Sequence, residues 1–128
     1  MFDASALVRS VIEPRSEARS WVARIGAGIE GFVPDLAYAE VAHALLRYVR
    51  GRIMTLQAAR EATANVAMLP LERVALGGLA TAALETAVAH ELSVYDGFYL
   101  LLAVREDAIL VTADRRLAAA YDRSELVT

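Results

Sequence analysis

The sequence contains no cysteine and no lysine. The absence of cysteine excludes disulfides, thiolate nucleophiles and thiolate metal sites. All 13 cationic side chains are arginine, so Schiff-base chemistry and a phosphate-binding lysine are excluded as well. With only two histidines, an all-histidine metal centre is not expected. Any bound metal should therefore rely mainly on oxygen ligands, which favours Mg²⁺ or Mn²⁺.

Long apolar runs and targeting segments are also missing. The chain is 57% hydrophobic, with a mean hydropathy of +0.40. Charged residues such as Glu85, Asp96 and Arg105 nevertheless interrupt the most apolar region before about 20 apolar residues accumulate. The N-terminus has no basic segment followed by an apolar core, so no secretion signal is predicted. We therefore expect no membrane span and a cytoplasmic location.

The 128 residues fit one domain of ordinary size, and no repeat or linker divides them. We predict a single domain over residues 1–128, folded because its apolar content exceeds that of disordered chains. The formal charge of −3 is unusual for a nucleic-acid-binding protein, which normally has a basic surface. If four of the acidic residues bound metal, the rest of the chain would carry no excess negative charge, and the cations would add attraction.

Apolar periodicity, punctuated by proline and glycine, predicts an alternation of strands and helices. The expected strands end at Asp3 and cover 31–34, 71–74, 108–111 and 126–127. The expected helices cover 5–11, 16–25, 35–50, 55–69, the stretch from Gly78 to His90, 96–105 and 114–121, with Ser5 capping the first. Helices between strands indicate a parallel sheet covered on both faces. In such sheets functional groups gather beyond the carboxyl ends of the strands.

Acidic residues in unusually apolar surroundings are the main chemical signal. Asp3 follows Phe2 at the end of the first expected strand, and Asp114 lies just beyond a later strand. Glu40 and Asp96 lie in early turns of apolar helices. Carboxylates that converge on a divalent cation would explain these settings, because an isolated buried carboxylate is unfavourable. The alternative for each residue is a helix cap or a solvated side chain.

Four segments, in this order, resemble the motifs of PIN-domain nucleases, and particularly of VapC-type toxin ribonucleases. They are FDASALV at 2–8, PDLAYAEVAHALLR at 34–47, YDGFYLLLA at 95–103 and LVTADRRL at 110–117. The third and fourth are the more specific, and together the four span nearly the whole chain. The resemblance implies an α/β fold, a PIN-like three-layer sandwich with a central parallel sheet of about five short strands flanked by helices.

The resemblance also implies a function. It implies an endoribonuclease that hydrolyses RNA phosphodiester bonds with a metal-activated water, and the toxin of a VapBC-type toxin-antitoxin system inhibited by a cognate VapB-type antitoxin. The implied ligands of Mg²⁺ or Mn²⁺ are Asp3, Glu40, Asp96 and Asp114. One ion and two ions are equally compatible with four ligands. The family and the apolar surplus favour a homodimer.

Neighbouring residues have candidate supporting roles. Ser5 and Thr112 are placed to orient an acid or a water by hydrogen bonding, with the helix cap as the alternative for Ser5. Several arginines near the acids are candidates for binding RNA phosphates, with solvated surface arginines as the alternative. They are Arg9, Arg47, Arg50, Arg52, Arg115 and Arg116.

Three positions depart from the usual motifs. Tyr38 stands where a small hydroxyl residue is common, His43 where asparagine is frequent, and Gly97 where alanine is usual. We expect Tyr38 and His43 to alter substrate fit, with His43 in a surface or packing role and not acting as a base. We expect Gly97 to loosen the first turn of its helix. The chain begins close to Asp3, which indicates either a first strand that has lost residues or a misassigned start site.

Three other functions are compatible with clustered acids. A non-catalytic PIN-like module would bind RNA or protein without cleavage, but the presence of all four acids argues against it. A phosphoacceptor domain or a haloacid-dehalogenase-type phosphatase generally uses a lysine, which this chain lacks. A DNA-directed relative of flap nucleases usually needs an additional helical clamp, for which the chain is too short.

Overall fold

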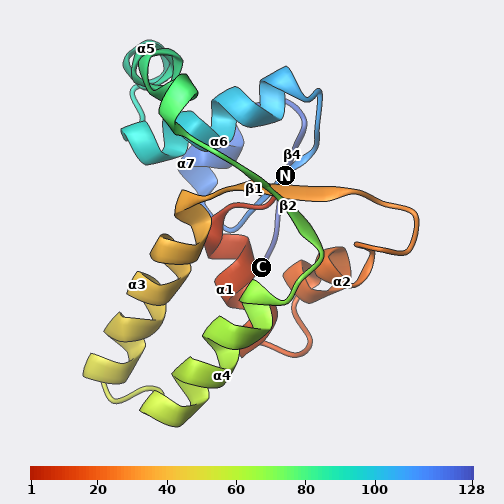
Figure 1. Ribbon diagram of the computed structural model, residues 1–128, viewed down its shortest axis with the longest axis vertical. Coiled ribbons are helices and arrows are strands. Elements are labelled where there is room, and N and C mark those ends of the chain that lie inside the picture. Colours follow the sequence, from red (N-terminus) through yellow and green to blue (C-terminus); the bar gives the residue numbers. More distant parts are fainter.

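The computed structural model describes residues 1–128, in which helices and short strands alternate (Figure 1). The elements are α1 Ala4–Ile12, α2 Glu17–Ala23, β1 Gly31–Pro34, α3 Leu36–Arg50, α4 Leu56–Ala67, β2 Leu71–Val74, the 3-10 helix η1 Gly77–Leu79, α5 Ala80–His90, α6 Val94–Arg105, β3 Leu110–Thr112, α7 Arg115–Ala119 and β4 Ser124–Leu126. This order confirms the α/β class predicted from the sequence.

The strands form two parallel pairs, β1 with β2 and β3 with β4. The N-terminal segment connects them. The Phe2 N–H donates to the Phe32 carbonyl at 3.3 Å, and the Asp3 N–H donates to the Val111 carbonyl at 3.2 Å. Phe2 forms a single parallel bridge with Val111. Across the middle layer the order is therefore β2, β1, residues 1–3, β3 and β4.

Helices pack on either side of these strands (Figure 1). On one side α1 packs against α2, α3 and α4, and on the other α5 packs against α6. The continuous core draws on both groups and on the strands, and includes Leu7, Val33, Leu45, Tyr99 and Leu110. This arrangement brings α3 and α6, which are far apart in sequence, to the same end of the sheet.

The helix starts follow local capping chemistry. The hydroxyls of Ser16 and Thr55 accept backbone N–H bonds at the starts of α2 and α4, where the sequence predicted helices. The prediction for the first helix was wrong in one respect. Asp3, and not Ser5, is the N-cap of α1, because the Asp3 carboxylate accepts a hydrogen bond from the Ala6 N–H at 2.9 Å. Ser5 therefore has its hydroxyl free for other contacts.

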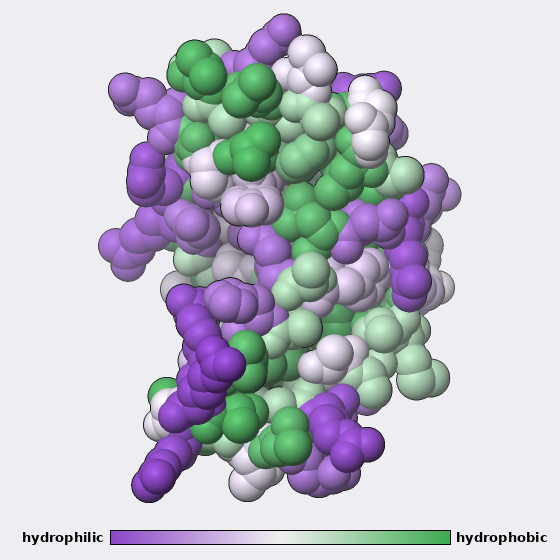
Figure 2. Space-filling model, turned by 60° about the vertical axis from the view of Figure 1, so that its left-hand side comes forward, coloured by the Kyte–Doolittle hydropathy of each residue, from purple (hydrophilic) through white to green (hydrophobic).

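Apolar side chains remain exposed at both ends of the long axis (Figure 2). At the end formed by α5 and α6 they include Leu84, Val88 and Val104, and at the α3–α4 end they include Leu46 and Leu56. No single helix is long and apolar enough to cross a membrane. The helices at 77–90 and 94–105 together have the length and composition of a membrane span, but the chain bends by 102° between them. Much of α6 is buried in the protein core, which accounts for its apolar composition.

Candidate active site

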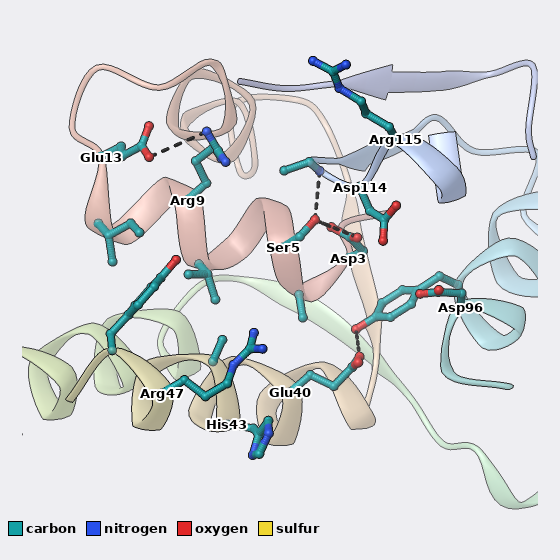
Figure 3. A pocket seen from close by; sticks show the side chains of 17 residues that line it. Asp3, Ser5, Arg9, Glu13, Glu40, His43, Arg47, Asp96, Asp114 and Arg115 are labelled. Atoms are coloured by element: carbon teal, nitrogen blue, oxygen red, sulfur yellow. Dashed lines mark hydrogen bonds and ion pairs between the residues drawn. The ribbon is translucent and has the colours of Figure 1, made fainter. Parts of the chain in front are cut away.

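A cavity of about 670 Å³ lies where the starts of α1 and α7 meet α3 and α6 (Figure 3). All four acids singled out from the sequence line it: Asp3, Glu40, Asp96 and Asp114. They come from four separate parts of the chain, and folding brings them to one hollow. None of them forms an ion pair with a cationic side chain.

Asp3 is the most deeply buried of the four, with 4% of its surface exposed. Thr112 Oγ1 donates to its Oδ2 at 2.6 Å, Ser5 Oγ contacts both carboxylate oxygens at 2.7 and 2.8 Å, and the Ala6 N–H donates to Oδ1. Burial raises the pKa of Asp3 to about 6 despite these hydrogen bonds, and the charge of Asp114 contributes in the same direction. The Asp3 carboxylate thus has neutral donors but no compensating cation.

The two hydroxyls that contact Asp3 also bind the turn between β3 and α7. The Ala113 N–H donates to Ser5 Oγ at 2.8 Å, and the Asp114 N–H donates to Thr112 Oγ1 at 2.9 Å. Each hydroxyl accepts one backbone hydrogen bond and directs its own proton to Asp3. Ser5 and Thr112, the residues expected to orient an acid, therefore contact Asp3 directly and connect it to the segment that carries Asp114.

Asp114 occupies the start of α7. Its Oδ1 accepts the N–H groups of Arg116 at 2.8 Å and Leu117 at 3.3 Å, which satisfies free donors at the helix N-terminus. Figure 3 shows the carboxylate on the side of the cavity where Asp3 and Asp96 lie. One oxygen therefore caps the helix while the group as a whole faces the cavity.

Glu40 and Asp96 stand on helices and are half-buried. The Tyr99 hydroxyl donates to Glu40 Oε1 at 2.7 Å. Burial raises the pKa of Glu40, with the charges of Asp96 and Asp3 acting in the same direction. Burial also raises the pKa of Asp96, and the charge of Asp114 adds to that effect. The carboxylates are thus close enough for the charges of their neighbours to disfavour the ionisation of Asp3, Glu40 and Asp96.

Helix capping involves two of the four acids. Asp3 caps α1 and Asp114 caps α7. The cap of α6 is Ser93, whose hydroxyl accepts the backbone N–H of Asp96 at 3.1 Å, so the Asp96 carboxylate is not the cap. The capping alternative raised from the sequence therefore applies to Asp3 and Asp114. It does not apply to Glu40, which lies well inside α3 and still faces the cavity.

The site suits a hard divalent cation in the kind of donor it offers. Its acids supply only oxygen ligands, and the buried Asp3 has no cation beside it. As placed, however, no group of three acidic or histidine side chains is close enough to hold one ion. The four acids share one cavity in this arrangement but do not form a metal-binding cluster.

Gly97, next to Asp96, has a different role from the one expected. A Cβ atom at this position would lie 2.6 Å from the Ala83 carbonyl oxygen and 3.2 Å from the Ala87 Cβ. The absence of a side chain thus allows α6 to lie directly against α5, with Gly97 itself buried at that contact. Gly97 positions the start of α6 and does not merely loosen it.

The arginines expected to bind RNA separate into two groups. Arg9, Arg47 and Arg115 line the cavity, whereas Arg50, Arg52 and Arg116 do not. In Figure 3 Arg47 extends from α3 toward the cavity interior, and Arg115 points away from the acids.

Two of these arginines have partners that limit their availability. The guanidinium of Arg116 donates to the Glu91 carbonyl at 2.7 Å, which holds it outside the cavity. Arg9 forms an ion pair with Glu13 at 3.6 Å, four residues further along the chain and just beyond the end of α1. Arg47 is in no ion pair.

Sequence reasoning missed two tyrosines that line the cavity, Tyr48 and Tyr99. Tyr99 follows Asp96 by three residues, and Tyr48 follows Glu40 by eight. Both spacings place the tyrosine on the same helix face as the acid, so the helical period was the available signal. His43 also lies at the cavity, but its ring points away from the acids in Figure 3, consistent with the expected surface role.

Comparison with known proteins bears on the family and the fold. The PIN domain family matches residues 1–123. Among solved structures, the crystal structure of PAE2754 from Pyrobaculum aerophilum is similar with a TM-score of 0.78 and 24% sequence identity, covering 98% of this chain and 81% of that one. At that identity the likeness bears on the fold alone. No curated protein matches the chain in sequence.

Proposed function

The chain belongs to the PIN domain family, whose members are generally nucleases, and we propose that it is an endoribonuclease dependent on Mg²⁺ or Mn²⁺. One observation carries the proposal. Four carboxylates from separate elements line a single cavity, and none forms an ion pair with a cationic side chain. Such a group of like charges is unfavourable unless a positive charge is supplied from outside the chain.

The residues around the cavity have distinct tasks in this proposal. Asp3, Glu40, Asp96 and Asp114 would hold the ion. A bound divalent ion activates a water molecule and stabilises the charge that develops on the phosphate. Ser5 and Thr112 fix the orientation of Asp3 through their hydroxyls, and Tyr99 orients Glu40 in the same way.

We further propose that the protein is a VapC-type toxin with a cognate VapB-type antitoxin, in a homodimer. The motif resemblance supports this assignment. An apolar groove of about 450 Å³ between α3 and α4 offers a surface for a protein partner, with Leu46, Val49 and Leu56 among its lining residues. Co-purification with the product of a neighbouring small open reading frame is expected. Failure to form that complex would count against the toxin assignment.

An RNA cleavage assay tests the catalytic proposal. Wild-type protein should cleave single-stranded RNA with Mg²⁺ or Mn²⁺ and should be inactive in EDTA. Asp96→Asn should cleave more than about a hundredfold more slowly, because even groups that only orient metal ligands contribute roughly 10- to 100-fold. Asp122→Asn is the matched control, since Asp122 is exposed, forms no ion pair and lies outside the cavity.

Thermal unfolding provides a readout that does not depend on activity. A ligand that binds only the native state stabilises it by about 2.7 kcal/mol at 100 times its dissociation constant. Mg²⁺ should therefore raise the melting temperature of wild type and Asp122→Asn, and much less that of Asp96→Asn. Equal cleavage by wild type and Asp96→Asn would remove the assignment. Metal-dependent stabilisation without cleavage of any RNA would favour the non-catalytic RNA- or protein-binding module.

A further inference from the structure

Part of the cavity lies away from Asp3, Glu40, Asp96 and Asp114. Beyond them its walls continue along α1 and α3, which pack against each other. The lining residues of this part, called here the α1–α3 subsite, are Val8, Arg9, Ile12, Glu13, Ala44, Arg47 and Tyr48. None of the predicted metal ligands lies among them.

Helical spacing makes this subsite a continuation of the acidic site. On α3 the lining residues Glu40, Ala44 and Tyr48 follow one another at intervals of four, so they share one face. Eight residues of helix advance about 12 Å. On α1 the residues Ser5 and Arg9 repeat the same interval, and Glu13 follows directly after the end of the helix. The two helices therefore form one track that begins at the carboxylates and leads away from them.

The chemistry changes from anionic to cationic and aromatic along this track. Arg47 is in no ion pair and extends into the cavity (Figure 3). Arg9 has only the exposed Glu13 as a partner, and an ion pair open to solvent is weak. Tyr48 is half-buried against the core, which holds its ring in place while part of its surface stays accessible. Val8, Ile12 and Ala44 supply apolar walls.

We propose that the α1–α3 subsite binds one nucleotide of single-stranded RNA next to the phosphate that is cleaved, with the base against Tyr48 and a phosphate at Arg47. An arginine suits a phosphate because its guanidinium donates paired hydrogen bonds, and an aromatic ring suits any base through stacking. The strand must be single, since only an unstacked base reaches a side chain in this way. This inference rests on the proposed function and names how its substrate is held.

Binding of a short fluorescently labelled single-stranded RNA to the Asp96→Asn protein, with Mg²⁺ present, tests the subsite without cleavage. Adding Tyr48→Ala or Tyr48→Leu should weaken binding by roughly tenfold, the usual contribution of base stacking. Tyr48→Phe keeps the ring and should bind like its parent. Tyr48→Leu keeps apolar bulk, so it separates loss of stacking from loss of fold. Tyr95→Ala is the control, because Tyr95 is 58% exposed and lies outside the cavity.

Arg47 is tested by the salt dependence of binding. Arg47→Gln should weaken binding and reduce the slope of log affinity against log salt by about 0.7, the value for one phosphate contact on a single strand. For an RNA that lacks the base at the position bound in the subsite, Tyr48→Leu should leave the binding affinity unchanged. These two results together would assign the phosphate to Arg47 and the base to Tyr48.

The outcomes separate this inference from the proposed function. RNA affinity that depends on Tyr48 supports the subsite even when the wild type cleaves nothing, in which case only the catalytic proposal fails. Unchanged RNA affinity in both Tyr48→Ala and Tyr48→Leu overturns the subsite even when the wild type cleaves RNA. Tyr48 variants that no longer bind a protein partner but keep full RNA affinity also overturn the subsite, because the α1–α3 subsite would then be a protein-binding surface.

Discussion

The four acids form two pairs that the fold positions in different ways. Asp3 and Asp114 lie at the ends of neighbouring strand segments, and the hydroxyls of Ser5 and Thr112 connect them. We call this the sheet side of the site. Glu40 and Asp96 form the helix side, on α3 and α6, and the main contact between those helices at the site is the single hydrogen bond from Tyr99 to Glu40.

The difference shows where the site is rigid. On the sheet side, hydrogen bonds of 2.6 to 2.9 Å surround Asp3 and fix it relative to the strands. On the helix side, the position of each carboxylate depends on how its helix packs. This explains how all four acids line one cavity although no three of them are placed to hold one ion. Metal binding should therefore draw the helix side toward the sheet side.

The largest expected effect is the contribution of Asp3 to the pH dependence of the free energy of unfolding. The folded pKa of this residue, about 6, lies above the ordinary 3.8, so the native state binds this proton more tightly than the unfolded chain does. Stability should therefore fall as pH rises from about 4 to about 6. The fall should be about 3 kcal/mol, since one pKa unit corresponds to about 1.4 kcal/mol.

Denaturant unfolding in EDTA, of wild type and Asp3→Asn across this pH range, measures the contribution. The difference in unfolding free energy between wild type and Asp3→Asn should change by about 3 kcal/mol over this range, because the variant has no carboxyl group to ionise at this position. Asp122→Asn should run parallel to wild type, since its side chain is exposed. Parallel curves for Asp3→Asn would show that the sheet side does not hold an uncompensated charge.

The sheet side was largely predictable from the sequence. Short apolar runs bounded by glycine and proline predicted β1 and β2 at their observed positions. Asp3 and Asp114 follow expected strand ends, where a parallel sheet collects functional groups. Even the error over the cap of α1 was local, because Asp3 and Ser5 are both good capping residues two positions apart.

The helix side was predictable only in part. Helical spacing puts Glu40 and Asp96 on early turns, but the distance between two helices has no such signal in the sequence. The contact of Gly97 with Ala83 is an example, because it depends on how closely α5 and α6 cross. The hydrogen bond from Tyr99 to Glu40 is another, since it joins residues 59 positions apart.

A smaller effect is expected from Gly97→Ala, which tests whether helix packing sets the position of Asp96. The added methyl group would meet a backbone carbonyl that no rotamer change can move. Overpacking of this kind destabilises by about 1 to 3 kcal/mol, against which alanine returns up to about 1 kcal/mol of helix propensity. We expect a net loss of about 1 to 2 kcal/mol in denaturant unfolding and a higher Mg²⁺ requirement for cleavage.

Gly78→Ala is the matched control, because a Cβ there would have no neighbour within 4 Å. It should change stability by no more than about 0.5 kcal/mol. A Gly97→Ala protein that is as stable as wild type and needs no more Mg²⁺ would mean that α5 moves aside freely, and that packing against α5 does not position Asp96.

The smallest effect is expected from Tyr99→Phe, which removes the hydroxyl and keeps the buried ring. Without this donor Glu40 loses its one side-chain hydrogen bond and samples more orientations. Because groups that orient metal ligands contribute roughly 10- to 100-fold, and Glu40 is one of four, we expect about a tenfold rise in the Mg²⁺ concentration for half-maximal cleavage. The rate at saturating Mg²⁺ should change little, and Tyr95→Phe, at an exposed position, should match wild type. A lower Mg²⁺ requirement would reverse the interpretation, because Tyr99 would then be holding Glu40 away from the ion, and the helix side would be restrained in an open position.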